Sequence, residues 1–235
     1  LTISTDGTHT VTVRTTDNAG LTNTATVNVP YDATPPTASL NIPAPNGANG
    51  WHTSPVTVLT NGTDAVSGIS NTAVRVNGGT WQSSASLSAD GIYTVEGQSR
   101  DNAGNLSAVP SATVRIDQTP PIASPSYPAP DGSNGWHVSN VTVTALGSDE
   151  TSGVASRQVS LDGTNWVNND TTITTDGIYT VIVRTIDNAG LSSTATAAIR
   201  RDATPPVISG LDVSGTAGNN GWYSSNVDVA GLAAD

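Results

Sequence analysis

The chain contains no cysteine, no methionine and no phenylalanine, and its eight basic residues are all arginine, so lysine is absent as well. Without cysteine the chain can form no disulfide bond and perform no thiol chemistry. Without lysine it can form neither a Schiff base nor a lysine–asparagine isopeptide bond. Its stability must therefore come from packing, from linkers or from bound ions.

Positive charge and long hydrophobic runs are also scarce. The formal net charge is -11 and the isoelectric point is near 4.3. The arginines form no basic stripe that could neutralise phosphates, so we expect neither nucleic acid nor an anionic membrane surface as a partner. No run approaches eighteen apolar residues and Leu1 does not begin a signal peptide. We therefore expect no membrane span and interpret the chain as a mature fragment.

The residues that are present favour an all-β protein. Threonine and valine are abundant, and 23 glycines and 14 prolines are spread along the chain, where they punctuate many short segments. Apolar and polar residues alternate within these segments, whereas a helical period is absent. This composition is typical of short strands joined by tight turns.

The sequence repeats itself with a step of 85 residues. The motif "DATPP" at 32–36 returns as "DQTPP" at 117–121 and as "DATPP" at 202–206, and "NGW" occurs at 49, 134 and 220. Such a period indicates tandem modules. Three longer segments also match: "DGTHTVTVRTTDNAGL" at 6–21, "DGIYTVEGQSRDNAGN" at 90–105 and "DGIYTVIVRTIDNAGL" at 176–191.

The repeat predicts two whole modules flanked by two partial ones. Residues 33–117 and 118–202 are the whole modules, residues 1–32 are the C-terminal part of a module, and residues 203–235 are the N-terminal part of another. Two interpretations are open: an excerpt of a longer tandem array, or partial ends that complement each other between chains by strand exchange. The excerpt is favoured, because a joined module would lack about 20 repeat positions.

Each module is predicted to be an immunoglobulin-like sandwich. Alternating segments with turns every 8 to 12 residues are typical of that fold. Tyr93 and Tyr179 follow a "DG" turn where such a sandwich has its tyrosine corner, and His9 takes this place in the first fragment. The strands expected in the first whole module cover residues 37–43, 55–61, 72–77, 80–86, 87–89, 92–100 and 111–117.

Four motifs in this order, "TSGV" at 151–154, "VSLDGTNW" at 159–166, "DGIYTVIVRTIDNAG" at 176–190 and "DATPP" at 202–206, resemble the bacterial immunoglobulin-like tandem repeats of large cell-surface proteins and adhesins. The resemblance covers essentially the whole chain. It implies tandem immunoglobulin-like, or fibronectin-III-like, β-sandwich modules arranged as an extended rod outside the cell or on its surface. It implies no particular ligand, because this fold has many roles.

Histidine offers no convincing catalytic group. His52 and His137 occupy equivalent positions, but the third copy has Tyr223 there, so the three share an aromatic ring rather than a base. Counting by two from Val141 places His137 on the inward side, where it would fill space in the core. We therefore predict no catalytic residue and no enzyme activity.

Tryptophan recurs at two places in the repeat. The same parity turns Trp51, Trp136 and Trp222 outward, where they could stack on a sugar or pack against an adjacent module or a neighbouring copy. Possible partners are therefore copies of the chain, or host or matrix glycans or proteins. Trp81 and Trp166 follow hairpin turns and are predicted to pack structurally beside the core valines.

Acidic residues are the best chemical lead. In a sandwich, the loop after the second strand and the loop between the last two strands lie at the end where the linker enters. The linker aspartates should therefore meet loop acids, and converging oxygens suit Ca²⁺, the one cofactor considered. The resemblance also implies a divalent ion at the linkers, because related adhesin repeats lock successive domains in this way. The alternative is that these residues form turns and caps. The predicted groups are Asp32 with Asp64 and Asp101, and Asp117 with Asp149, Glu150 and Asp187.

Two functional hypotheses follow from the sequence. The first is a structural extracellular repeat protein that forms a cell-surface stalk, filament or sheath from tandem modules. The second is an adhesin or carbohydrate-binding module that uses the outward tryptophans as platforms. The sequence alone leaves the ligand, any polymerisation and the binding of calcium open.

Overall fold

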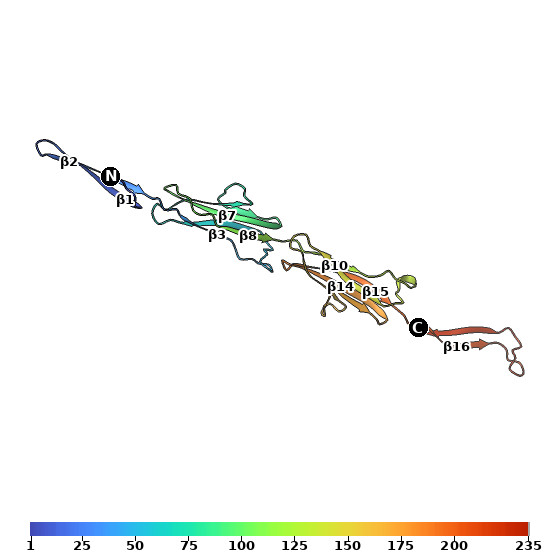
Figure 1. Cartoon of the computed structure of the whole chain (residues 1–235). Helices are drawn as coiled ribbons and strands as arrows, with labels where there is room; N and C mark the ends of the chain where they lie inside the picture. Colours follow the sequence, from blue (N-terminus) through green and yellow to red (C-terminus); the bar gives the residue numbers. More distant parts are fainter. Residues whose placement is uncertain (235) are drawn as a thin grey trace. The chain divides into compact units, whose positions relative to one another are not determined.

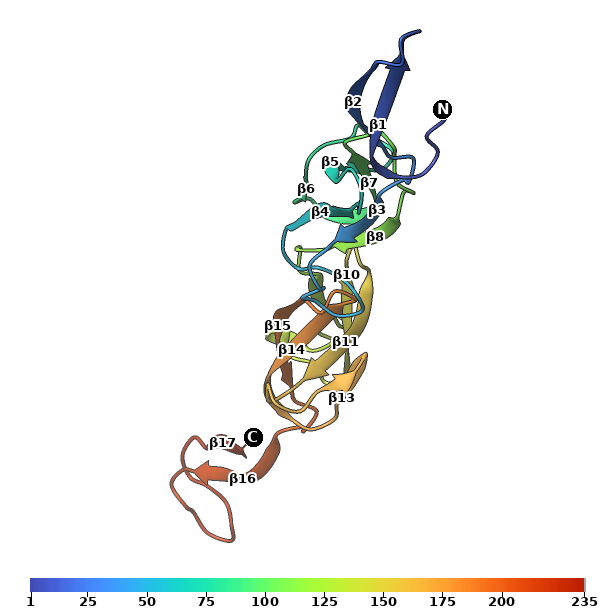
Figure 2. The same cartoon turned by 90° about the vertical axis from the view of Figure 1, so that its left-hand side faces the viewer.

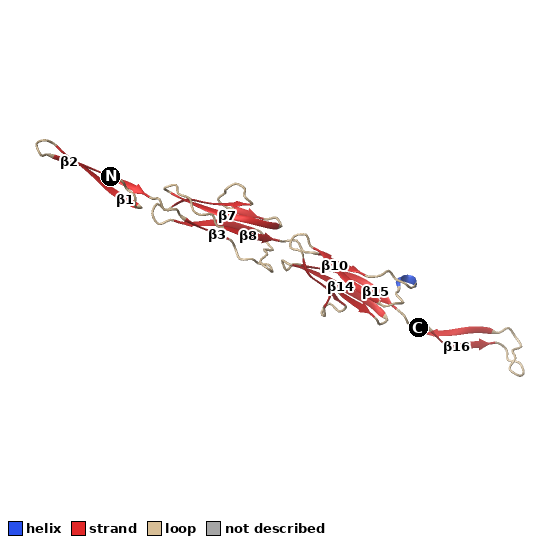
Figure 3. Cartoon of the chain, in the orientation of Figure 1, coloured by secondary structure: helices blue, strands red, loops and turns tan. Residues whose placement is uncertain are grey.

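The computed structural model describes residues 1–234, and its regular structure is almost entirely β-strand (Figures 1 and 3), which confirms the all-β class. No helix among these residues is long and apolar enough to cross a membrane. One short 3-10 turn, Ser133–Gly135, precedes β10. The strands are β1 (Gly7–Thr16), β2 (Thr22–Tyr31), β3 (Thr37–Asn41), β4 (Val56–Thr63), β5 (Ile69–Val76), β6 (Ala85–Leu87), β7 (Gly91–Asp101), β8 (Ser111–Ile116), β9 (Ile122–Ser126), β10 (Val141–Ser148), β11 (Val154–Ser160), β12 (Val167–Asn168), β13 (Asp170–Ile173), β14 (Gly177–Asp187), β15 (Ser192–Arg201), β16 (Val207–Ser214) and β17 (Asp228–Ala234).

The chain forms two compact units. The first contains Leu1–Pro120 together with two loops, Asp149–Gly153 and Asp187–Leu191, that come from further along the sequence. The second contains Pro121–Ser148, Val154–Ile186 and Ser192–Asp235, of which residue 235 lies outside the described part. The two later loops thus belong structurally with the unit that precedes them. The module boundaries expected from the repeat stay a prediction.

Strands β9 to β15 form a two-sheet sandwich (Figure 2). One sheet has the order β13-β10-β9 and the other β12-β11-β14-β15. In the first sheet β10 pairs antiparallel with both neighbours, and in the second β11 pairs antiparallel with β12 and β14 with β15. Two sheets with this strand order are typical of the immunoglobulin-like fold. The inner faces meet in one core of small apolar side chains: Val141, Val143, Ala145, Val159, Ile173, Val181, Val183, Ala197 and Ile199.

Strands β3 to β8 form the corresponding sandwich in the first unit, with sheets β3-β4-β6 and β5-β7-β8. The strand predicted over 80–86 forms only in part: Gln82 makes an isolated bridge to Val74 on β5, and residues 85–86 belong to β6, which pairs with β4 in the other sheet. The exposed polar residues between them, Ser83 and Ser84, bury no side chain on either sheet, so the expected strand is interrupted there. The core of this sandwich consists of Val56, Val58, Val74, Ala85, Leu87, Val95, Val114 and Ile116.

The alternation of side chains explains both cores. In β4 the side chains of Val56, Val58 and Thr60 point inward and those between them outward, as the period of two requires. Each fully buried valine contributes about 1.5–3 kcal/mol to folding. The two sheets come close together at Gly147, where an added Cβ would collide with Thr185 Oγ1 and lie 2.6 Å from the carbonyl oxygen of Ile122. Only glycine fits such a close approach of strands.

The predicted tyrosine corners are confirmed. The hydroxyl of Tyr93 donates to the carbonyl of Ala89 at 2.9 Å, and that of Tyr179 donates to the carbonyl of Thr175 at 3.1 Å. In the first fragment, His9 Nε2 lies 2.7 Å from the carbonyl oxygen four residues upstream, so histidine makes the equivalent contact. The corner is therefore a property of the position rather than of tyrosine.

Trp81 and Trp166 lie outside the two core clusters and are half-buried. Arg75 covers the ring of Trp81 at 4.6 Å from its centroid, and Arg184 covers that of Trp166 at 4.1 Å. Arg75 also forms an ion pair of 2.8 Å with its cross-strand partner Glu96. Both tryptophans thus pack against a stacked arginine and not within the valine clusters, and their structural role stays a prediction.

Candidate metal centre

Each linker is held at its start by the aspartate of the preceding "DG" turn. Asp90 accepts the backbone N–H of Gln118 at 2.8 Å and the hydroxyl of Thr119 at 2.5 Å. Asp6 and Asp176 accept the equivalent bonds from residues 33–34 and 203–204. Sequence reasoning missed this clamp, although "DG" and "D-x-T" recur in register. The two prolines that follow fix φ, so the linker has little freedom.

The aspartate that opens the second linker enters a loop cluster within the first unit. Asp117 is completely buried, and its carboxylate accepts the backbone N–H groups of Thr119 and Ser152, each at 3.2 Å. Asp149 Oδ1 accepts three backbone N–H groups, those of residues 151, 152 and 153. Asp187 Oδ1 accepts the N–H of Leu191 at 2.9 Å. The turn and capping role that was the alternative for these acids is therefore present.

The same three aspartates also converge. One carboxylate oxygen each of Asp117, Asp149 and Asp187 lies within 4.8 Å of the others. Glu150 does not join this group: it is exposed, because Asp149 turns inward to cap the loop and its neighbour faces solvent. An equivalent group with the same spacing is formed around the first linker by Asp32, Asp64 and Asp101.

The two groups differ at one position. In the first, Asn105 donates its side-chain N–H to Asp101 Oδ2 at 2.8 Å, and backbone N–H groups satisfy Oδ1. In the second, the repeat places Leu191 where Asn105 stands. Asp187 Oδ2 is consequently buried without a hydrogen-bond partner among residues 1–234. Sequence comparison of "DNAGN" with "DNAGL" contains this difference, but only the structure shows its consequence.

The pKa values of Asp101 and Asp187 are shifted in opposite directions. Burial alone would raise the pKa of Asp101, but the hydrogen bonds from the side chain and backbone of Asn105 and from Gly104 bring that pKa below its usual value. Burial raises the pKa of Asp187, and the nearby charges of Asp117 and Asp149 raise it further. The surroundings of Asp187 therefore disfavour its charged form, whereas the hydrogen bonds around Asp101 favour the charged form.

Histidine and tryptophan have the following positions. His52 and His137 are buried, as expected for space-filling rings. The outward orientation predicted for Trp51 is wrong: only 7% of it is exposed, because a loop with positive φ at Asn49 and Gly50 interrupts the strand alternation. Trp136 is half-buried and Trp222 is 77% exposed. The residues Trp136 and Trp222 therefore remain available for contact.

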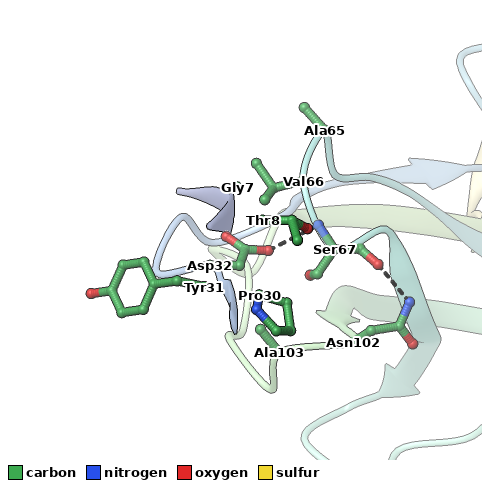
Figure 4. Close-up of a pocket in the computed structure, with 10 residues that line it drawn as sticks. All are labelled: Gly7, Thr8, Pro30, Tyr31, Asp32, Ala65, Val66, Ser67, Asn102 and Ala103. Carbon is green, nitrogen blue, oxygen red and sulfur yellow. Dashed lines mark hydrogen bonds between the residues drawn. The ribbon is translucent and has the colours of Figure 1, made fainter. Parts of the chain in front are cut away.

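A cavity of about 610 Å³ lies beside the first aspartate group, between the β1–β2 hairpin and two loops (Figure 4). Tyr31 and Asp32 line one side, and Ser67, Asn102 and Ala103 line another. Ser67 N–H donates to Asp32 Oδ2 at 3.1 Å, and the Asn102 amide donates to the carbonyl of Ser67 at 2.7 Å. The cavity is thus framed by the same loops that hold the linker.

Comparison with known proteins gives structural neighbours only. No family model matches the chain. A search of curated proteins finds no match either. The fibronectin(III)-like modules of Clostridium thermocellum CbhA match at 12% identity, over 69% of this chain and 95% of theirs, with a TM-score of 0.36.

Two adhesin structures are also similar. A tetra-tandem repeat from the extending region of a large adhesion protein matches at 18% identity, over 97% of this chain and 70% of its own, with a TM-score of 0.35. A bacterial ice-binding adhesin matches at 17% identity, over 85% and 76% of the two chains, with a TM-score of 0.37. The structural neighbours of this all-β chain thus include fibronectin-III-like modules and adhesin tandem repeats, the class that its sequence motifs resemble.

Proposed function

We propose that the chain is a structural extracellular repeat protein of a surface stalk, filament or sheath, in which linker aspartates fasten each module to the loops of the next. We further propose that Ca²⁺ completes the fastening at Asp117, Asp149 and Asp187. The observation that supports this most strongly is the buried, unpartnered Oδ2 of Asp187 among two other carboxylates.

The charges explain why a cation would bind there. Two carboxylates within 4.8 Å repel each other by about 3 kcal/mol at an effective dielectric constant of about 20. A divalent ion turns this repulsion into attraction and satisfies the orphaned oxygen. Carboxylates supplemented by backbone carbonyls and water suit the flexible coordination of Ca²⁺ better than the strict octahedron of Mg²⁺.

The origin of the ligands couples binding to fastening. Asp117 comes from the linker, whereas Asp149 and Asp187 come from two loops that belong to the same unit. An ion that needs all three binds only when linker and loops have come together, so its binding free energy stabilises the junction. At the first group, the amide of Asn105 already occupies the corresponding carboxylate oxygen.

Thermal unfolding tests the proposal directly. The chain is melted in chelator, in excess Ca²⁺ and in excess Mg²⁺. We expect Ca²⁺ to raise the melting temperature and Mg²⁺ to have little effect. An ion at about 100 times its dissociation constant adds about 2.7 kcal/mol, or about 10 °C or more for a module of this size. Identical melts in chelator and Ca²⁺ would refute the cation.

The alternative function is a carbohydrate-binding or adhesin module. The exposure of Trp222 and the partial exposure of Trp136 favour it, because an accessible indole can stack on a sugar ring. A glycan array with the intact chain tests this role. Binding that is lost in Trp136→Ala or Trp222→Ala, with an unchanged melting temperature, would support it, and an array without any bound glycan would count against it.

A further inference from the structure

The β1–β2 hairpin presents an apolar face that has no cover among residues 1–234. Val13 is 60% exposed and Val27 is 57% exposed. The repeat aligns these residues with Val183 and Ala197, which lie in the core of the β9–β15 sandwich. The full set on the hairpin is Val11, Val13, Val27 and Val29, whose equivalents are Val181, Val183, Ala197 and Ile199.

The β16–β17 hairpin presents the complementary half of the same core. Val227 and Val229 are exposed, and the repeat aligns them with Val141 and Val143. In the β9–β15 sandwich, Val141 and Val143 are completely buried in one cluster with the equivalents of the β1–β2 face. The two exposed faces of the chain are therefore surfaces that pack against each other wherever both occur in one module.

Backbone groups match in the same way. His137 N–H donates to the carbonyl of Arg200 at 2.8 Å, and the N–H of Asp202 donates to the carbonyl of His137 at 2.9 Å. His52 forms the same pair of bonds with residues 115 and 117. The equivalent of Arg200 is Pro30, which has the same register position on β2, and the equivalent of His137 is Tyr223. The backbone of Tyr223 can thus form the same two hydrogen bonds, one to the carbonyl of Pro30 and one from the N–H of Asp32.

The cavity at Asn102 and Ala103 matches a position that is occupied in the second aspartate group. There, Ala48 N–H donates to the carbonyl of Ala189 at 2.7 Å, and the side chain of Asn49 donates to the carbonyl of Asn188 at 3.0 Å. The repeat aligns residues 188–189 with 102–103, which line the cavity. Ala189 is buried under its loop partner, whereas Ala103 is exposed.

The loop that fits this cavity is preformed near β17. Residues 218–222 align with residues 47–51, and Asn220 and Gly221 have φ values of 55° and 79°, against 52° and 79° at Asn49 and Gly50. Both loops also close by the same backbone hydrogen bond, from the first glycine to the tryptophan carbonyl. Trp222 is 77% exposed here, whereas Trp51 in the docked loop is buried.

We infer that the β16–β17 hairpin of one copy packs on the β1–β2 hairpin of a second copy and places its Asn-Gly-Trp loop in the cavity at Asn102 and Ala103. The inference rests on the proposed role as a repeat that associates with its own kind, but it needs no cation. The donating and accepting surfaces are different, so the association is head to tail and continues into open chains. The joined body lacks counterparts of β11, β12 and β13, so it is weaker than the packing within a whole module.

Two variants of the full chain test this inference. Val13→Asp places a charge on the accepting face, and Val229→Asp places one on the donating face. Both residues are exposed outside the two core clusters, so neither change should alter the melting of the sandwiches. Thr12→Asp is the matched control, because this substitution adds the same charge on the opposite face of β1.

Analytical ultracentrifugation gives the readout, at concentrations up to about 1 mM, where weak interfaces associate. We expect the wild type and Thr12→Asp to form a concentration-dependent series of oligomers. Each aspartate variant alone should associate at least about 10-fold more weakly, because it must desolvate a charge. An equimolar mixture of Val13→Asp and Val229→Asp should form a dimer and nothing larger, since one intact face of each kind remains.

Three results would overturn the inference: a monomeric wild type at every concentration, a mixture that does not dimerise, or a loss of association in Thr12→Asp as large as in Val13→Asp. The runs are made in chelator and in Ca²⁺. Association that persists in chelator while Ca²⁺ fails to bind refutes the proposed cation alone. Calcium binding by a chain that stays monomeric refutes the strand complementation alone.

Discussion

Exchanging the residues that distinguish the two aspartate groups should exchange their response to calcium. Leu191→Asn gives Asp187 Oδ2 the amide donor that Asp101 receives from Asn105 at 2.8 Å. A hydrogen bond to a charged group contributes about 1.5–3 kcal/mol. Removing the half-buried leucine costs about 1 kcal/mol. In chelator we expect a net gain of about 1 kcal/mol, which corresponds to a rise of about 4–8 °C in melting temperature.

The reverse change should have the opposite effect. Asn105→Leu removes the donor from Asp101 Oδ2 and leaves this buried carboxylate as Asp187 is now. An unsatisfied buried group costs about 1–3 kcal/mol or more when charged, so the variant should melt at a lower temperature in chelator. It should also gain a response to Ca²⁺ at the group around Asp32. Melting curves in chelator and in Ca²⁺ measure both effects.

Leu106→Asn is the matched control for the first exchange, because it makes the same chemical change at an exposed residue. It should leave the difference between the chelator and Ca²⁺ melts as it is in the wild type. The reasoning would be refuted if Leu191→Asn kept the full calcium response, or if Asn105→Leu melted like the wild type under both conditions. Either result would mean that the orphaned oxygen does not determine cation binding.

Three further changes test other parts of the structure. Tyr93→Phe removes a hydrogen bond to the backbone and should lower the free energy of unfolding by about 1 kcal/mol in urea titration. Gly147→Ala places a Cβ against Thr185 Oγ1 and 2.6 Å from the carbonyl oxygen of Ile122, and should cost about 1–3 kcal/mol in the same assay. The hydroxyl of Thr204, followed by a backbone N–H, lowers the pKa of Asp176, so the stability that this carboxylate contributes is present above its unfolded pKa of about 3.9 and is lost as the pH falls through its lower folded value. Thr204→Val should reduce this acid dependence, measured as the urea midpoint between about pH 4 and pH 2.

The sandwich could be predicted because its signals are local and repeated. Alternating valines as in β4 and the tyrosine after each "DG" turn are determined by the period of a strand and by one turn. The convergence of acids could be predicted as well, since the ends of a sandwich bring fixed loops together. Asp117, Asp149 and Asp187 do meet there.

Other features depend on contacts that a strand pattern does not contain. Trp51 is buried because a loop with positive φ at Asn49 breaks the alternation on which its outward orientation was based. Glu150 faces solvent because its neighbour caps the turn. The stacking of Arg184 on Trp166 joins residues from different strands, and their pairing is visible only in the folded sheet.

The number of calcium ions bound per chain tests the central claim most directly. Isothermal titration of Ca²⁺ into the chelator-treated chain should show one site, at Asp117, Asp149 and Asp187, because Asn105 already satisfies the other group. Asp187→Asn should remove that site. A wild type without a binding heat and with no calcium retained on equilibrium dialysis would contradict the account, as would an Asp187→Asn variant that still binds one ion.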